Sequence, residues 1–200
     1  MDVSSEKAKE SLTVVQATTK TTTKSLAATY AGPILILWGV FMILAFLGSH
    51  LLVVLVLHKW LWHLWVSMSA IGSIMTFLIC WRQYSRGVPI KNPALAKAGW
   101  RDLAFWLLLF AYLGIWFCIV KHWHGVQLNA FICTVIMFAY VVMGLYEPGS
   151  KFMIWLGLSV TALTLIGYYL IPHDYYCLWM APAFGGALLG TGLYLRFRYK

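Results

Sequence analysis

Histidines are the side chains of this sequence that could hold a metal ion or change charge near neutral pH. His122 and His124 lie in a short polar stretch, where i,i+2 spacing in a turn can bring both rings to one ligand. Asp174 follows His173, and its carboxylate could orient that ring or add an oxygen ligand. A transition metal site, a haem site or a proton sensor would use such groups. Interfacial histidines among Trp and Tyr are the alternative. The candidate ligands are His122, His124, His63, His50, His173 and Asp174.

Common enzyme signatures are absent from the sequence, which has no P-loop, no GxGxxG and no HExxH. Gly48-Ser49-His50 has the residue types of a serine nucleophile and its base, but neighbouring side chains on a helix diverge. The four cysteines have no CxxC spacing and indicate small apolar helix residues. We therefore expect a protein that is not an enzyme, and the sequence leaves any cofactor unknown.

The amino-acid composition indicates the class of structure that holds these residues in place. The 200 residues are 62% hydrophobic and only 10% charged, too few polar groups to cover a soluble globule. Charge-free apolar runs of eighteen or more residues suit helices that cross about 30 Å of hydrocarbon. The sequence predicts an all-α, polytopic transmembrane bundle, with the lipid bilayer as its partner and no nucleic acid partner.

Six transmembrane helices are predicted in one domain, residues 30–200. A polar segment, residues 1–29, is expected to be a mobile cytoplasmic tail because it has few large apolar groups to bury. No charged residue falls in the middle of a predicted helix, which argues against an ion-coupled pump. The approximate helices are 33–57, 61–81, 103–120, 128–145, 152–171 and 176–195.

Basic residues gather on one side of this topology. Nine short-loop cations lie on one face and two, Lys59 and Lys121, on the other, so both termini are predicted to be cytoplasmic in a bacterial inner membrane. All six histidines then fall in the outer half of the bundle, with many of the tryptophans near its two surfaces.

The second and last predicted helices repeat a pattern. Residues 64–82 and 178–196 both start with Leu-Trp, carry a glycine seven residues after the Trp and reach an arginine ten residues later. The first and third hairpins therefore read as a parallel repeat. Small residues at the aligned positions form stripes that let helices approach closely in lipid. The stripes are Ser69, Gly72, Ser73 and Thr76, and Ala183, Gly186, Ala187 and Gly190.

Glycine-bearing hairpins of this kind, marked by Gly39, Gly72, Gly157 and Gly186, resemble those of small six-helix bacterial inner-membrane proteins of the HdeD-type acid-resistance family. The hairpin at 103–145 lacks the pattern. The resemblance implies the same fold plan and a stress-related role at the membrane.

Three functions fit the sequence. The first is a non-enzymatic membrane protein whose outer face, rich in His and aromatic residues, binds metal or senses pH. The second is a permease for a small neutral solute, with a path lined by Ser73, Thr76 and Thr191 between the second and sixth helices. The third is a structural subunit of a larger complex, a homo- or hetero-oligomer joined through the small-residue faces.

Overall fold

Helices account for nearly all of the computed structural model, which describes residues 3–85, 93–119, 125–146 and 151–198 and contains no strand in those ranges. This confirms the all-α class. The elements are α1 (Val3–Val54), η1 (His58–Trp60), α2 (Leu61–Ser85), α3 (Pro93–Ile119), α4 (Gly125–Tyr146), α5 (Lys151–Leu170), η2 (His173–Tyr175), α6 (Tyr176–Met180), η3 (Ala181–Gly186) and α7 (Ala187–Arg198).

Five helical stretches in the described part of the chain are long and apolar enough to cross a membrane, as a multi-pass membrane protein requires. The remaining predicted crossing, the helix at 103–120, corresponds to α3, whose apolar part is Leu103–Ile119. At 1.5 Å per residue this part is about 26 Å long, somewhat shorter than the hydrocarbon core. The sixth crossing stays a prediction. The five stretches are Ala31–Val54, His58–Arg82, Gly125–Tyr146, Lys151–Leu170 and His173–Arg198.

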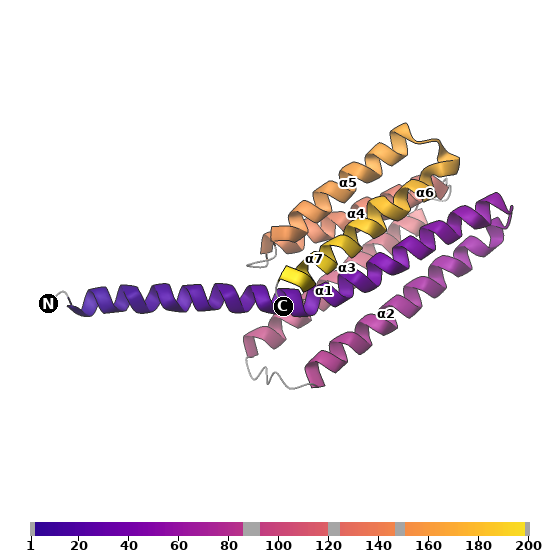
Figure 1. Cartoon of the computed structure of the whole chain (residues 1–200). Helices are drawn as coiled ribbons and strands as arrows, with labels where there is room; N and C mark the ends of the chain where they lie inside the picture. Colours follow the sequence, from indigo (N-terminus) through magenta and orange to yellow (C-terminus); the bar gives the residue numbers. More distant parts are fainter. Residues whose placement is uncertain (1–2, 86–92, 120–124, 147–150, 199–200) are drawn as a thin grey trace.

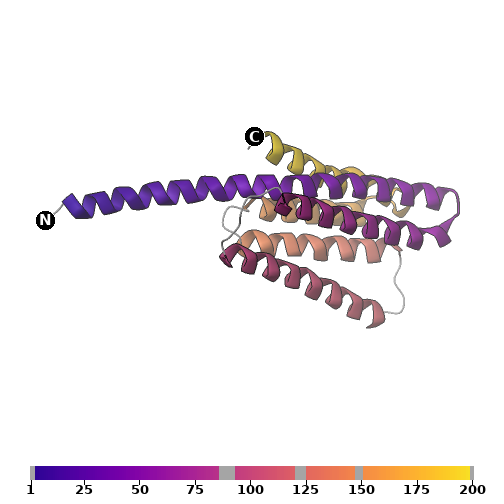
Figure 2. The same cartoon turned by 90° about the horizontal axis from the view of Figure 1, so that it is seen from below.

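The first helix is much longer than predicted. α1 begins at Val3, and Pro33, the predicted start, lies inside it. The segment predicted as a mobile tail is thus helical from Val3 onward, and it extends alone beyond the bundle in both views (Figures 1 and 2). A helix already nucleated in an apolar segment gains a hydrogen bond for each residue added, so a polar segment with good helix formers can continue it.

Glycines set the closest helix contacts. A Cβ on Gly39 of α1 would lie 2.5 Å from the backbone nitrogen of Leu189 in α7. A Cβ on Gly157 of α5 would lie 2.6 Å from the carbonyl oxygen of Met137 in α4. Only a hydrogen fits at these positions, so the α1–α7 and α4–α5 pairs approach backbone to backbone, as helices in lipid do.

The last predicted helix is interrupted by a wider turn. Residues Ala181–Gly186 form the π-helix η3, which contains Pro182 and lies between α6 and α7. Proline has no N–H donor and its ring crowds the preceding turn, and a π-turn accommodates both. Within η3, a Cβ on Gly185 would lie 2.7 Å from the backbone nitrogen of Ile43 in α1. The turn therefore presents a flat backbone surface to α1.

Two helices lie at the edge of the bundle. α2 packs mainly on α1, while α3 makes no extensive backbone contact with another described helix. Aromatic side chains link α3 to α4: the rings of Trp106 and Tyr140 are 6.1 Å apart, and those of Trp116 and Phe131 are 6.4 Å apart. Most of the apolar surface of α2 and α3 is exposed and faces outward.

Candidate functional site

The turns η1 and η2 lie at the same end of the bundle, and the C-terminus lies at the other end (Figure 1). His50, in the last turn and a half of α1, meets η2 there. Its Nδ1 atom is 3.2 Å from the backbone oxygen of Asp174, and its ring is 6.3 Å from that of Tyr175. Because a carbonyl oxygen can only accept, Nδ1 carries the proton in this contact. His50 and Asp174, both predicted site residues, are thus brought together.

His63 lies apart from this contact. It is exposed at the start of α2, its Nδ1 is 3.3 Å from the carbonyl oxygen of Lys59, and its ring is 5.3 Å from that of Trp60. These partners belong to the adjacent turn η1. His63 is therefore engaged locally, and a role as ligand beside His50 stays a prediction.

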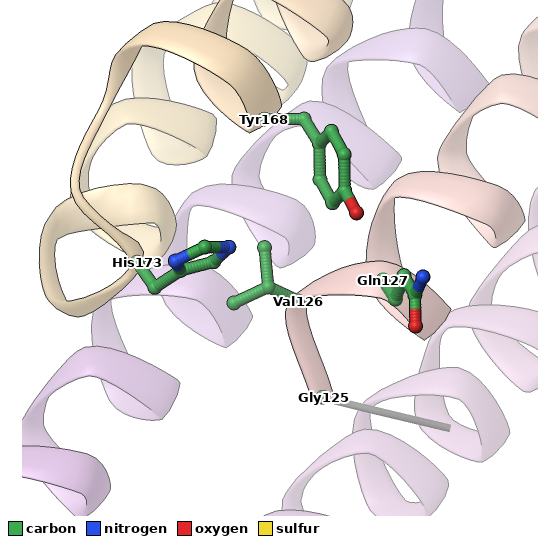
Figure 3. A pocket seen from close by; sticks show the side chains of 5 residues that line it. All are labelled: Gly125, Val126, Gln127, Tyr168 and His173. Carbon is green, nitrogen blue, oxygen red and sulfur yellow. The ribbon is translucent and has the colours of Figure 1, made fainter. Parts of the chain in front are cut away.

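His173 lines a pocket of about 440 Å³ between η2, α5 and the start of α4. Figure 3 shows its ring and the Tyr168 phenol from the α5–η2 side, opposite Val126 and Gln127 of α4. The His173 and Tyr168 rings meet edge to face, 6.2 Å apart. Gly125, which also lines the pocket, follows His124 in the sequence, but His122 and His124 themselves lie outside the described residues.

A metal centre is not assembled by the described residues alone. Among them, no group of three or more His, Cys, Asp or Glu side chains is close enough to hold an ion. The pocket beside His173 offers one imidazole, one phenol and one amide, which are hydrogen-bonding groups for a polar ligand. The His50 contact and the His173 pocket both involve residues of η2.

The small residues of α2 are divided between two surroundings. Gly72 is buried against Trp38 of α1, whose indole donates to the Thr76 hydroxyl at 3.1 Å, and Thr76 in turn donates to the Gly72 carbonyl oxygen at 2.8 Å. Ser69 and Ser73 are exposed on the other side. One side of the stripe therefore packs on α1, and the other faces outward.

The small residues of the last helix have different surroundings, and the predicted packing of this stripe stays a prediction. Ala183 is buried and Ala187 half-buried, but a Cβ on Gly190 would meet nothing within 4 Å, and one on Gly186 would meet only Pro182 of the same helix. Alignment with α2 identifies matching positions, but it does not show which face meets a neighbour. The glycines that contact α1 are instead Gly185 and Gly192.

α1 also lies between the two helices of the predicted permease path. Both α2 and α7 pack extensively on α1, and neither packs extensively on the other. Ser73 is exposed, and Thr76 is occupied by its hydrogen bonds to Trp38 and Gly72. In the described residues α2 and α7 are thus not packed on each other, and the permease path stays a prediction.

Sequence reasoning missed hydrogen bonds made by tryptophans inside the bundle. Trp65 of α2 donates its indole N–H to the buried hydroxyl of Ser49 at 3.1 Å. Trp179 of α6 donates to the carbonyl oxygen of Leu163 in α5 at 3.0 Å. The repeated Leu-Trp pair was the signal that could have found both bonds.

Comparison with protein-family models, with curated proteins and with solved structures finds no match to this chain, so these contacts and the sequence carry the functional argument.

Proposed function

We propose that this protein is a multi-pass protein of a bacterial inner membrane, with both termini in the cytoplasm, and that its outer end responds to protonation of His50. The observation that carries the proposal is the 3.2 Å contact between His50 Nδ1 and the Asp174 backbone oxygen. This contact joins the α1–α2 hairpin to the turn of the α5–α6 hairpin, so a change of charge at His50 acts between two parts of the fold.

Protonation should strengthen this contact. A charged imidazolium forms a stronger hydrogen bond to a carbonyl than a neutral ring does, and its charge is attracted to the side chain of Asp174. Lys59 opposes this attraction from η1, but as an exposed side chain it is largely screened by water. Titratable groups lie on four described elements that contact α1 at this end: His58 and Lys59 of η1, His63 of α2, His173, Asp174 and Tyr175 of η2, and Tyr176 and Cys177 of α6.

The direction of the pH effect follows from this argument. Because the protonated ring makes the stronger contact, the outer ends of the two hairpins are held together more tightly in acid than at alkaline pH. A protein of this kind would report or resist acidification of the outer compartment.

A similar hydrogen bond in the α1–α2 and α5–α6 hairpins supports treating each hairpin as one unit. Trp65 and Ser49 are separated by 16 residues, and so are Trp179 and Leu163, and each tryptophan bonds to the first helix of its own hairpin. The two similar hairpins pack on each other along α1 and α7, and His50 adds a contact at their outer ends that depends on its charge. The resemblance of the hairpins to the HdeD-type acid-resistance family stays a prediction. The acid response that the family name implies agrees with the proposed response to protonation of His50.

The test compares His50→Gln with His58→Gln in detergent-solubilised protein. His58 is exposed in η1 at the same end and makes a matched control for loss of one imidazole. We expect the wild type and His58→Gln to be stabilised more at pH 5 relative to pH 8 than His50→Gln is. Tryptophan fluorescence during chemical unfolding measures this. Equal pH dependence of all three proteins would contradict the proposal.

A second candidate function, a subunit of a larger membrane complex, is favoured by the edge position of α2. Only 6% of its most apolar stretch is buried within the chain, against 44% for the stretch His173–Arg198. The exposed Ser69 and Ser73 would let another helix approach closely there. The mass of the detergent-purified protein, with the detergent contribution subtracted, distinguishes the cases. A monomer that is unchanged by lipid and by concentration would exclude a homo-oligomer.

A further inference from the structure

The turn that follows α1 is closed by its own backbone. The N–H of Leu57 donates to the carbonyl oxygen of Leu52 at 2.8 Å, and the N–H of Val56 donates to that of Val53 at 3.0 Å. This pair of bonds defines a Schellman cap, in which a residue just past the helix adopts a left-handed conformation. Val56 is that residue, with a φ of 58°. The N–H groups of Leu55, Val56 and Leu57 all have acceptors within the chain, so none of them needs water.

Valine is an unusual residue for this conformation. Glycine is usual there because it has no Cβ, and a β-branched residue with positive φ is strained. Among the described residues, Val56 is the one non-glycine residue with positive φ. Its side chain is 76% exposed, so packing within the chain offsets little of the strain. Strained residues persist where their surroundings favour them, and the surroundings of Val56 lie outside the chain.

The tip of the α1–α2 hairpin is apolar throughout. Residues 51–57 are leucines and valines only. In water such a run would expose a contiguous apolar patch, which is uncommon on soluble surfaces. The exposed members include four consecutive residues, and consecutive side chains at a helix end diverge, so no single face of a partner protein covers them all. The exposed members are Leu51, Val54, Leu55, Val56 and Leu57.

Polar and aromatic residues mark where this apolar tip ends. His58, Lys59, Trp60 and Trp62 follow it, and all four are exposed. Tryptophan beside a basic residue at the end of an apolar run is typical of the membrane interface. The turn η2, at the same end of the bundle, instead exposes a histidine and an aspartate (Figure 1). The two turns therefore suit different surroundings, lipid for the α1–α2 turn and water for η2.

We propose that the turn of the α1–α2 hairpin, residues 51–57, does not project into water but lies at the boundary between lipid headgroups and acyl chains, where it anchors the hairpin. Trp60 and Trp62 then lie at the level of the headgroups. Apolar side chains of membrane-surface segments are buried at this boundary. Backbone polar groups near the hydrocarbon must find partners within the protein, and the Schellman bonds supply them for the N–H groups of the turn.

This location explains the valine. A cap in water is well served by glycine or asparagine, which both adopt the left-handed conformation readily. At the acyl boundary the Val56 side chain gains by leaving water, whereas an asparagine amide would lose hydrogen bonds to water. The gain offsets the strain of Val56. The anchor does not depend on the His50 contact or on which side of the membrane the tip occupies.

The test places a nitroxide label on one introduced cysteine, after the four native cysteines are replaced by serine or alanine. Val56→Cys probes the turn. Leu44→Cys, exposed within the membrane span of α1, is the lipid control, and Glu10→Cys, exposed in the extension of α1, is the water control. In vesicles of phosphatidylethanolamine and phosphatidylglycerol, we expect collisions with oxygen to exceed those with a water-soluble nickel chelate at Val56→Cys and Leu44→Cys, and the reverse at Glu10→Cys. Nickel access at Val56→Cys equal to that at Glu10→Cys would place the turn in water. Low access of both reagents would show that protein covers it, and either result refutes the proposal.

A second measurement keeps the native cysteines, so it holds even if the cysteine-free protein folds poorly. Val56→Gly and Val56→Asn both relieve the left-handed strain, but only asparagine brings a polar side chain to the acyl boundary. We expect Val56→Asn to unfold at a lower SDS content than Val56→Gly when both are titrated in lipid–detergent bicelles. Equal stability of the two variants, or greater stability of Val56→Asn, would place the turn in water and refute the proposal.

Discussion

The hairpins α1–α2 and α5–α6 hold their helices together with the same side chain but different partners. In each, a tryptophan of the second helix donates its indole N–H to the first helix, 16 residues earlier. Trp65 donates to the hydroxyl of Ser49, whereas Trp179 donates to the backbone oxygen of Leu163. A backbone carbonyl is present whatever the residue type, but a hydroxyl depends on one side chain. The α1–α2 bond is therefore the more easily lost in mutation.

The glycines at the two hairpin contacts also indicate that the α1–α2 hairpin is less tightly packed than the α5–α6 hairpin. A Cβ on Gly167 of α5 would lie 2.4 Å from Cδ1 of Trp179, so the ring occupies the space that a methyl group would need. A Cβ on Gly48 of α1 would lie 3.1 Å from the end of the Leu64 side chain, which can rotate away. The α5–α6 hairpin is therefore tightly packed where Trp179 meets Gly167. The α1–α2 hairpin is less tightly packed where Leu64 meets Gly48.

The largest effect should come from the contact that joins the two hairpins. Gly39→Ala places a methyl group 2.5 Å from the Leu189 backbone nitrogen, and backbone cannot rotate away, so α1 and α7 must separate. We expect a loss of about 2 to 3 kcal/mol of stability, measured by chemical unfolding in detergent. Gly190→Ala is the control. It meets open space and should be neutral or slightly stabilising because alanine favours helix more than glycine does.

Either of two results would break this part of the comparison. If Gly39→Ala is as stable as the wild type, the α1–α7 approach is looser than the glycine contact indicates. If Gly190→Ala is as damaging as Gly39→Ala, the face of α7 that carries Gly190 is covered by another chain, which would favour the subunit function.

A smaller effect should separate the two hairpins directly. Gly167→Ala must displace Trp179 and weaken its bond to Leu163, and we expect a loss of about 1 to 2 kcal/mol. Gly48→Ala only turns the Leu64 side chain and should cost less than about 1 kcal/mol. Unfolding curves of the two variants at one pH give the difference. Equal losses of stability would mean that the two hairpins are equally tightly packed at these glycines.

The apolar segments were predictable because crossing lipid fixes their length and composition. The predicted helices 61–81, 128–145 and 152–171 match α2, α4 and α5 to within a few residues, since Gly, Pro and charged residues mark their ends. The extension of α1 to Val3 was not predictable in this way. This segment is polar, so its sequence contains no hydrophobic pattern that would predict a helix.

The contact faces of the helices could not be read from the repeat. Small residues recur around the last helix, and only the fold selects Gly185 and Gly192, rather than Gly186 and Gly190, to meet α1. The π-turn at η3 adds to this difficulty because it changes the angular spacing of the residues within it.

The candidate site was predicted as residue types but not as an arrangement. His50 and Asp174 are separated by more than half of the chain, so their contact depends on how α1 lies beside η2. Local sequence spacing contains no signal for this contact.

A further effect, smaller than that of Gly167→Ala, tests the hydroxyl of the α1–α2 hairpin. Ser49→Ala removes the acceptor of the Trp65 indole, which leaves a half-buried N–H without its partner and should cost about 1 kcal/mol. Ser73→Ala, on the exposed side of α2, is the matched control and should change stability by less than about 0.5 kcal/mol. Because the indole of Trp65 is half-buried, water can replace part of the lost bond, so the cost stays below that of Gly167→Ala. A larger loss for Ser49→Ala than for Gly167→Ala, measured by unfolding in detergent, would reverse the ranking and make the α1–α2 hairpin the more rigid of the two.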